Sequence, residues 1–262
     1  MKNNKYKILV LSDLKKSVST TLKSSVSLAK MIDAEIALFH VKKHIDIVDR
    51  DNQFTAMRTL NEEHNNTKKN MDALVNRFSK EYNVNIKSNY AFGKIKEEIQ
   101  KQIKSYNPDI IVLGQRDTTP FKFIGDSITR FILKNFKGII MIASNENALE
   151  PNEKMTLGVL NTSNKVFETE FTKDLITHTK TPVKSFRILN SQKEQSDVLS
   201  LNEEKMVEYV FDKNANSMTT LSSYLLKNNI NLLCVDRAEN ETKTPLKEVV
   251  NKLNVSLLVS EA

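Results

Sequence analysis

Residues 109–143, DIIVLGQRDTTPFKFIGDSITRFILKNFKGIIMIA, have the pattern of a buried strand, a loop with glycines at Gly114 and Gly125, an amphipathic helix and a second buried strand. In α/β proteins such a loop is a common place for phosphate groups, because glycine allows close backbone approach and the helix start offers free N–H groups. The same loop carries Asp117 and Asp126, whose negative charge would oppose a phosphate. The stretch therefore predicts a parallel sheet and leaves its ligand open.

The rest of the first half extends this pattern. Apolar residues at helical spacing separate the candidate strands. Four of the candidate strands are nearly continuous apolar runs, which is typical of parallel strands covered on both faces. A fifth alternates between apolar and polar residues, like an edge strand. The four are residues 6–12, 35–41, 109–113 and 138–143, and the fifth is 84–90. With right-handed crossovers, this order predicts an open, doubly wound, Rossmann-like parallel sheet with strand order 3-2-1-4-5.

The second half repeats the plan in shorter form. A polar, proline-containing segment at 144–154 is the natural linker between the halves. We therefore predict two tandem five-stranded α/β domains, at 1–146 and 154–262, the second being a degenerate and shorter copy. Its expected strands are 155–160, 183–189, 206–211, 231–235 and 255–259, with helices at 221–229 and 246–253.

Composition excludes several classes of protein. The chain has 262 residues, 39% of them hydrophobic and 27% charged, and no apolar run approaches the ~18 residues that span a bilayer. The net charge of +7 comes from scattered lysines without interleaved aromatics, so no nucleic-acid or membrane surface is expected. One cysteine, Cys234, allows no disulfide within the chain, and a cytoplasmic location is predicted.

Both the plan and the loop resemble the universal stress protein family. The residues YKILVLSDLKKSVSTTLKSSVSLAKMIDAEIALFHV look like the opening strand–helix–strand of that family, and FGKIKEEIQKQIKSYNPDIIVLG like its approach to the fourth strand. Nucleotide-binding members carry the pattern G-x2-G-x9-G-(S/T) after this strand. Here Gly114 matches the first glycine and Gly125 the third, whereas Asp117 replaces the second and Asp126 takes the Ser/Thr position, in a loop about two residues short.

The resemblance implies a candidate adenine-nucleotide site in the first half. Asp13 matches an aspartate near the nucleotide, and Val41 an apolar residue beside the adenine. Together with neighbouring cations and hydroxyls, the candidate residues are Asp13, Val41, Gly114, Arg116, Asp117, Gly125, Asp126 and Ser127. In the second half, Thr162 stands at the position of Asp13 and Asp236 at that of Gly114, so no comparable loop is expected there.

Several of these residues have two interpretations. Asp126 is either part of a ligand site or a helix N-cap, since aspartate is favoured there. Asp13 either contacts a ribose or a metal ion, or it caps the following helix. A bridging Mg²⁺ would reverse the repulsion between the two loop aspartates and a triphosphate. His40 is interpreted as a structural histidine.

Two functional hypotheses follow. The first is a stress-response protein that acts by binding, with ATP held weakly or with help from Mg²⁺ in the first domain. The alternative is a nucleotide-independent module that binds an unknown protein partner, in which the two domains form an intramolecular pseudo-dimer, or the chain a homodimer. No residue constellation supports catalysis, and a slow nucleotide hydrolase is a weaker third option.

Overall fold

The computed structural model describes residues 4–15, 17–43, 53–115, 127–161, 169–180, 182–189, 206–237 and 246–260. All structural statements below concern these residues. The first half contains β1 Tyr6–Ser12, α1 Val18–Ile32, β2 Ala34–Lys42, α2 Gln53–Tyr82, β3 Ile86–Phe92, α3 Ile95–Tyr106, β4 Ile110–Gly114, α4 Ser127–Asn135 and β5 Ile139–Ala143. The second half contains β6 Leu157–Leu160, α5 Glu170–Thr177, β7 Val183–Leu189, β8 Met206–Asp212, α6 Ser217–Lys227, β9 Leu232–Asp236, α8 Leu246–Lys252 and β10 Ser256–Ser260.

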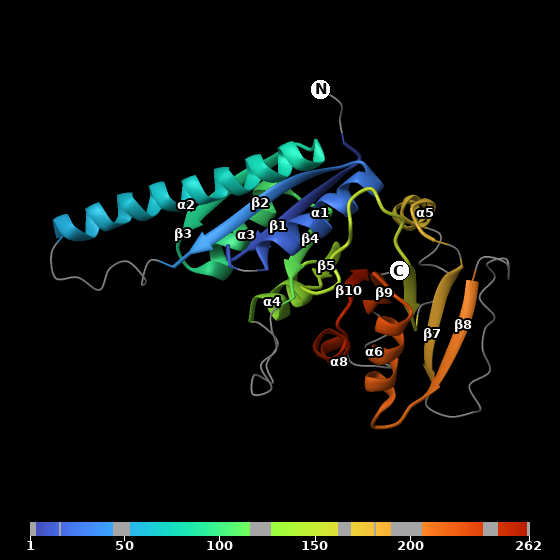
Figure 1. Cartoon of the computed structure of the whole chain (residues 1–262). Coiled ribbons are helices and arrows are strands. Elements are labelled where there is room, and N and C mark those ends of the chain that lie inside the picture. The colour runs from blue at the N-terminus through green and yellow to red at the C-terminus, as the bar shows by residue number, and fades with distance from the viewer. Residues whose placement is uncertain are drawn as a thin grey trace.

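The ten strands form one continuous sheet in the order β3-β2-β1-β4-β5-β10-β9-β6-β7-β8 (Figure 1). Each half has the strand order 3-2-1-4-5 with all its pairings parallel, so the predicted fold is confirmed. The two halves meet where β5 and β10 pair antiparallel, with Met141 opposite Leu258. An antiparallel joint at the last strands relates the halves by an approximate twofold axis.

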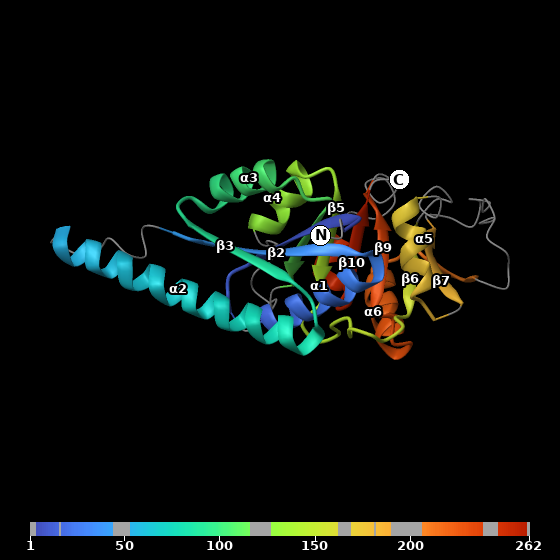
Figure 2. The ribbon, with the colours of Figure 1, turned by 90° about the horizontal axis from the view of Figure 1, so that it is seen from above.

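Helices cover both faces of the sheet, and Figure 2 shows α1 and α2 on one side of the first-half strands and α3 and α4 on the other. One apolar layer lies under α1, α2 and α5, with Val26, Met71 and Leu175 among its buried residues. The other lies under α3, α4, α6 and α8. Because both faces of the central strands are buried, strands such as β1, β4 and β9 are nearly continuous apolar runs, whereas the outer strands β3 and β8 are mixed in polarity.

One helix was not predicted from the sequence. Helix α5 has only eight residues, and its N-cap is Thr169, whose side chain accepts a hydrogen bond from the Thr172 amide. Its buried side chains are Phe171, Thr172 and Leu175, too few to give a clear helical period. The expected strands are present with ends shifted by up to two residues. Residues 190–205, between β7 and β8, lie outside the described residues.

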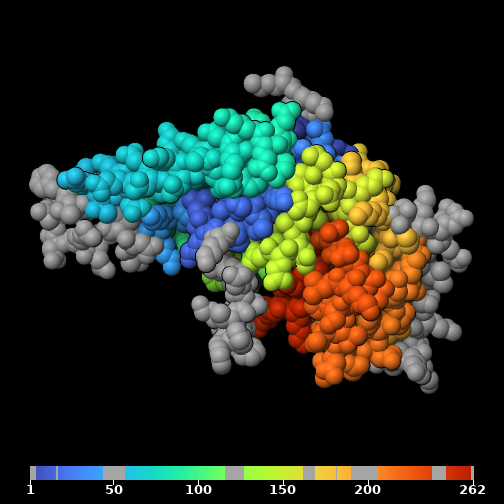
Figure 3. Space-filling model, in the orientation of Figure 1, coloured from blue at the N-terminus to red at the C-terminus, as the bar shows by residue number. Residues whose placement is uncertain are grey.

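The linker packs against α1 and holds the halves together. Leu149 is buried, and its amide donates to the Ser24 hydroxyl at 3.0 Å. Lys23 forms an ion pair with Glu150 whose Nζ–Oε1 distance is 2.6 Å. In the space-filling view of Figure 3, this yellow-green segment lies in contact with both the blue and the orange parts of the surface. Helix α1 therefore contacts the linker at the junction between the halves.

Candidate functional site

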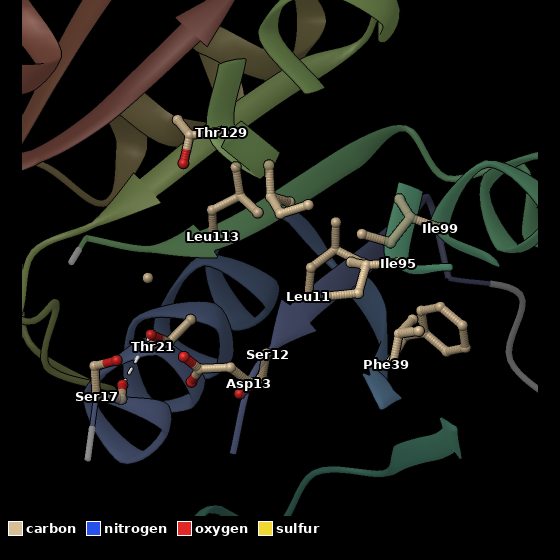
Figure 4. Close-up of a pocket in the computed structure, with 13 residues that line it drawn as sticks. Leu11, Ser12, Asp13, Ser17, Thr21, Phe39, Ile95, Ile99, Leu113 and Thr129 are labelled. Atoms are coloured by element: carbon tan, nitrogen blue, oxygen red, sulfur yellow. Dashed lines mark hydrogen bonds between the residues drawn. The ribbon is translucent and has the colours of Figure 1, made fainter. Parts of the chain in front are cut away.

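A pocket of about 100 Å³ opens at the carboxyl ends of β1, β2 and β4 (Figure 4). In doubly wound sheets this is the preferred ligand position, because the connections leave neighbouring strands toward opposite faces and open a crevice. Here this topological switch point lies between β1 and β4. Strand β1 leads into α1 on one face of the sheet, and β4 follows α3 on the other face. The fold alone thus places a crevice beside Asp13 and Gly114.

One side of the pocket is apolar. Leu11 and Leu113 come from β1 and β4, and Ile95 and Ile99 come from α3. In Figure 4 these apolar side chains lie across the cavity from the polar side chains of Asp13, Ser17 and Thr21. The remaining apolar lining residues are Phe39, Val41 and Ile128. A surface of aliphatic side chains and one aromatic ring is suited to a flat apolar group such as a purine base.

The other side of the pocket is polar and is formed mainly by the loop between β1 and α1. The Asp13 carboxylate accepts a hydrogen bond from the Lys15 amide at 3.0 Å, and the Ser12 hydroxyl accepts one from Leu14 at 3.0 Å. Leu14 has φ 57°, an uncommon value that the two side-chain bonds stabilise. Ser17, Thr21 and Thr129 add hydroxyls to the lining, and Asp13, Ser17 and Thr21 lie together in Figure 4. The carboxylate is therefore held in place before any ligand binds.

Gly114 has a structural reason to be glycine. A Cβ at this position would lie 2.5 Å from the Thr21 hydroxyl oxygen. Thr21 is itself fixed, because its hydroxyl donates to the Ser17 carbonyl at 2.9 Å and its side chain is buried. The glycine allows β4 to lie close to the first turn of α1, so packing within the protein explains it without a phosphate.

His40 is a buried structural residue, as predicted. Its Nδ1 donates to the Ser12 carbonyl across 2.8 Å and ties the end of β2 to the end of β1. Burial lowers the pKa of the His40 imidazole, and this outweighs the opposing effect of the hydrogen bond. A neutral imidazole beside the pocket adds no positive charge to it.

The structure brings Asp13, Val41 and Gly114 together in the pocket lining. Ser127 begins α4, is exposed and is not among the lining residues. Four other candidates, Arg116, Asp117, Gly125 and Asp126, lie outside the described residues. Sequence reasoning had not included Ser17 and Thr21 in the site. Two hydroxyls four residues apart in the first turn after β1 were the available signal, since such residues share one helix face.

The equivalent region of the second half carries a cluster of aromatic side chains. Leu11 pairs with Phe39 in the first half, and the corresponding pairing in the second joins Leu160 to Phe186. Phe186 is fully buried, and its ring stacks on Tyr209 with the centroids 5.7 Å apart. The rings of Phe211 and Tyr224 lie 6.4 Å and 5.8 Å from it.

Strand β9 ends at Asp236, which occupies the place of Gly114 at the end of β4, as the sequence layout predicted. Asp236 is buried. Asp236 replaces the glycine, and three further aromatic rings surround Phe186, whose counterpart in the first half is Phe39.

Among the described residues, no group of three or more His, Cys, Asp or Glu side chains is arranged to hold a metal ion. Within the same ranges, each helix is too short or too polar to cross a bilayer.

The fold and the crevice define a doubly wound α/β protein of tandem organisation. The chain belongs to the universal stress protein family, whose model matches residues 6–142. No curated protein shows significant sequence similarity to it.

Solved structures agree on the fold over the whole length. A universal stress protein from Archaeoglobus fulgidus superimposes with a TM-score of 0.71 at 13% identity, covering 97% of this chain and 98% of that one. A putative universal stress protein from Pseudomonas aeruginosa gives 0.61 at 11% identity, covering 98% and 93%. The cytoplasmic domain of a prokaryotic cation chloride cotransporter gives 0.52 at 12% identity, covering 97% and 95%. The third protein differs in kind from the first two, so function has to be argued from the site.

Proposed function

We propose that this chain is a stress-response protein that acts by binding, and that its first half holds ATP or a related adenine nucleotide in the pocket beside Asp13. The observation that carries the proposal is the position of this crevice at the topological switch point. An apolar wall for a base faces a fixed carboxylate and several hydroxyls that suit a ribose. The second half serves as the structural partner of the first.

Magnesium is proposed only as a companion of a bound triphosphate. Mg²⁺ favours six oxygen ligands and usually keeps several waters together with one or two carboxylates and phosphate oxygens. Asp13 is the one carboxylate among the described lining residues. The protein residues described here fit a shared ion between Asp13 and a phosphate, and do not form a cage that would bind the metal alone.

The test is isothermal titration of ATP, with and without Mg²⁺, and of AMP against the purified full chain. Val41→Phe places a ring in the base side of the pocket and should remove most of the binding heat. Val210→Phe is the matched control, because Val210 is 55% exposed on β8 and lies outside the pocket. Absence of heat with every nucleotide would overturn the proposal, as would equal loss in both variants.

An alternative is a nucleotide-independent module that binds a protein partner. The continuous ten-stranded sheet favours it, because the pseudo-dimer forms within one chain and leaves β3 and β8 as the outer strands. Native mass spectrometry of the purified protein separates the two proposals. Co-purified nucleotide supports the first, and a ligand-free chain that binds no added nucleotide supports the second.

A further inference from the structure

Among the described lining residues, the polar side of the pocket has one acidic side chain and no basic one. Its polar lining residues are Asp13 and four hydroxyl residues, Ser12, Ser17, Thr21 and Thr129, and no lysine or arginine belongs to the described lining. We propose that this pocket recognises the nucleoside part of its ligand and disfavours added phosphates, so that uncharged adenosine binds more tightly than metal-free ATP. This inference rests on the proposed function.

One of the lining hydroxyls beside Asp13, that of Thr21, already donates its proton within the protein. The Ser17 carbonyl accepts from the hydroxyls of Thr20 and Thr21, at 2.8 Å and 2.9 Å, as well as from the Thr21 amide at 3.0 Å. The Ser12 hydroxyl accepts from the Leu14 amide. A hydroxyl that has given its proton to a carbonyl cannot also donate it to a phosphate oxygen. Among the lining hydroxyls, that of Thr21 is therefore not available as a donor to an anion.

The first turn of α1 is a further potential source of positive charge at the pocket. A helix N-terminus carries a partial positive charge that favours an anion. Here Asp13 precedes Ser17, the N-cap residue of α1, by four residues and shares the pocket lining with it. A carboxylate fixed at this position already complements the dipole, so a phosphate gains little from it and is repelled by Asp13.

The sequence of the following loop carries no net formal charge. Residues 115–126 contain Arg116 and Lys122 as cations and Asp117 and Asp126 as anions, so their formal charges cancel. A triphosphate carries about four negative charges at neutral pH and needs several cations or donors to offset its desolvation. Neither the described lining nor the composition of this loop supplies such an excess.

The experiment compares adenosine, AMP, ADP and ATP by isothermal titration against the full chain in EDTA at low ionic strength. Affinity should fall with each phosphate, and metal-free ATP should bind about tenfold or more weakly than adenosine. Asp13→Asn keeps an oxygen for the Lys15 amide while removing the charge. It should reduce the ratio of the adenosine affinity to the ATP affinity about tenfold. Asp72→Asn makes the same change in net charge at an exposed position of α2, and it should leave the affinity ratio unchanged.

The outcomes separate this inference from the proposed function. Metal-free ATP that binds as tightly as adenosine, or more tightly, overturns the inference and leaves nucleotide binding intact. A ratio that Asp72→Asn alters as much as Asp13→Asn also overturns it, because the effect would then come from net charge. If no adenine compound binds, the proposed function fails and the inference fails with it.

Discussion

Gln115 and Arg237 occupy equivalent positions in the two halves, and each donates a hydrogen bond to a main-chain carbonyl of the other half. Gln115 follows β4, and its Nε2 lies 3.0 Å from the carbonyl oxygen of Leu253, directly after α8. Arg237 follows β9 and donates across 3.0 Å to the carbonyl of Phe136, directly after α4. The approximate twofold axis at the β5–β10 pairing relates these two hydrogen bonds to each other. The residue that leads into the candidate loop of the first half is therefore fixed to the second half.

Arg237→Leu should destabilise the protein by about 1–3 kcal/mol, because it deprives the Phe136 carbonyl of this donor. Arg237→Gln should recover part of that loss, since a glutamine serves in the same position at Gln115. Urea unfolding followed by circular dichroism measures both values. Equal destabilisation by the two substitutions would show that the cross-domain bond contributes little.

Gly114→Ala should destabilise the protein by about 1–3 kcal/mol through overpacking against the Thr21 hydroxyl. Thr21→Ala removes that oxygen, so the double variant should be less destabilised than the sum of the single ones, with a coupling of at least about 0.5 kcal/mol. A double-mutant cycle of unfolding free energies tests this. Additive effects would mean that Gly114 is glycine for a reason other than the contact with Thr21.

Phe186→Ala should cost about 3–5 kcal/mol, because it removes a fully buried ring that three other aromatic side chains surround. Phe211→Ala is the matched control at the half-buried edge of the same cluster and should cost less. Thermal unfolding of both variants provides the comparison. Similar losses would indicate that the cluster is not centred on Phe186.

Stability should fall as the pH drops below about 6.5, in part because of His40. Burial lowers the pKa of His40 in the folded protein, so the unfolded chain takes up a proton near pH 6.5 before the folded protein does. Unfolding then binds a proton, and His40 contributes a loss of at most about 1.4 kcal/mol per pH unit in that range.

The measurement is the free energy of unfolding in urea at pH 7.5 and pH 5.5. His40→Asn keeps a donor for the Ser12 carbonyl and should lose less stability between these two pH values than the natural protein. His178→Asn, at an exposed position, should behave like the natural protein. An unchanged pH dependence in His40→Asn would contradict the assignment.

The sequence by itself determined the fold of both halves. Continuous apolar strands such as residues 6–12 and 110–114 allow only a sheet that is buried on both faces, and the intervening helical periods impose the crossovers. The resemblance to the family also implied that Asp13, Val41 and Gly114 belong to one site, and the structure places all three in the lining of one pocket. It did not predict α5, whose short apolar pattern becomes a helix only when Phe171 and Leu175 are buried against the rest of the protein.

Only the tertiary structure decided how the site is built and how the halves are joined. The contact between Gly114 and Thr21 links residues far apart in the chain, and no local pattern gives its distance. The clustering of Phe186, Tyr209 and Tyr224 in the second half required the register of three separate elements. The exchange of bonds by Gln115 and Arg237 exists because β5 and β10 pair antiparallel, and the pairing of two edges depends on the folded surfaces that present them.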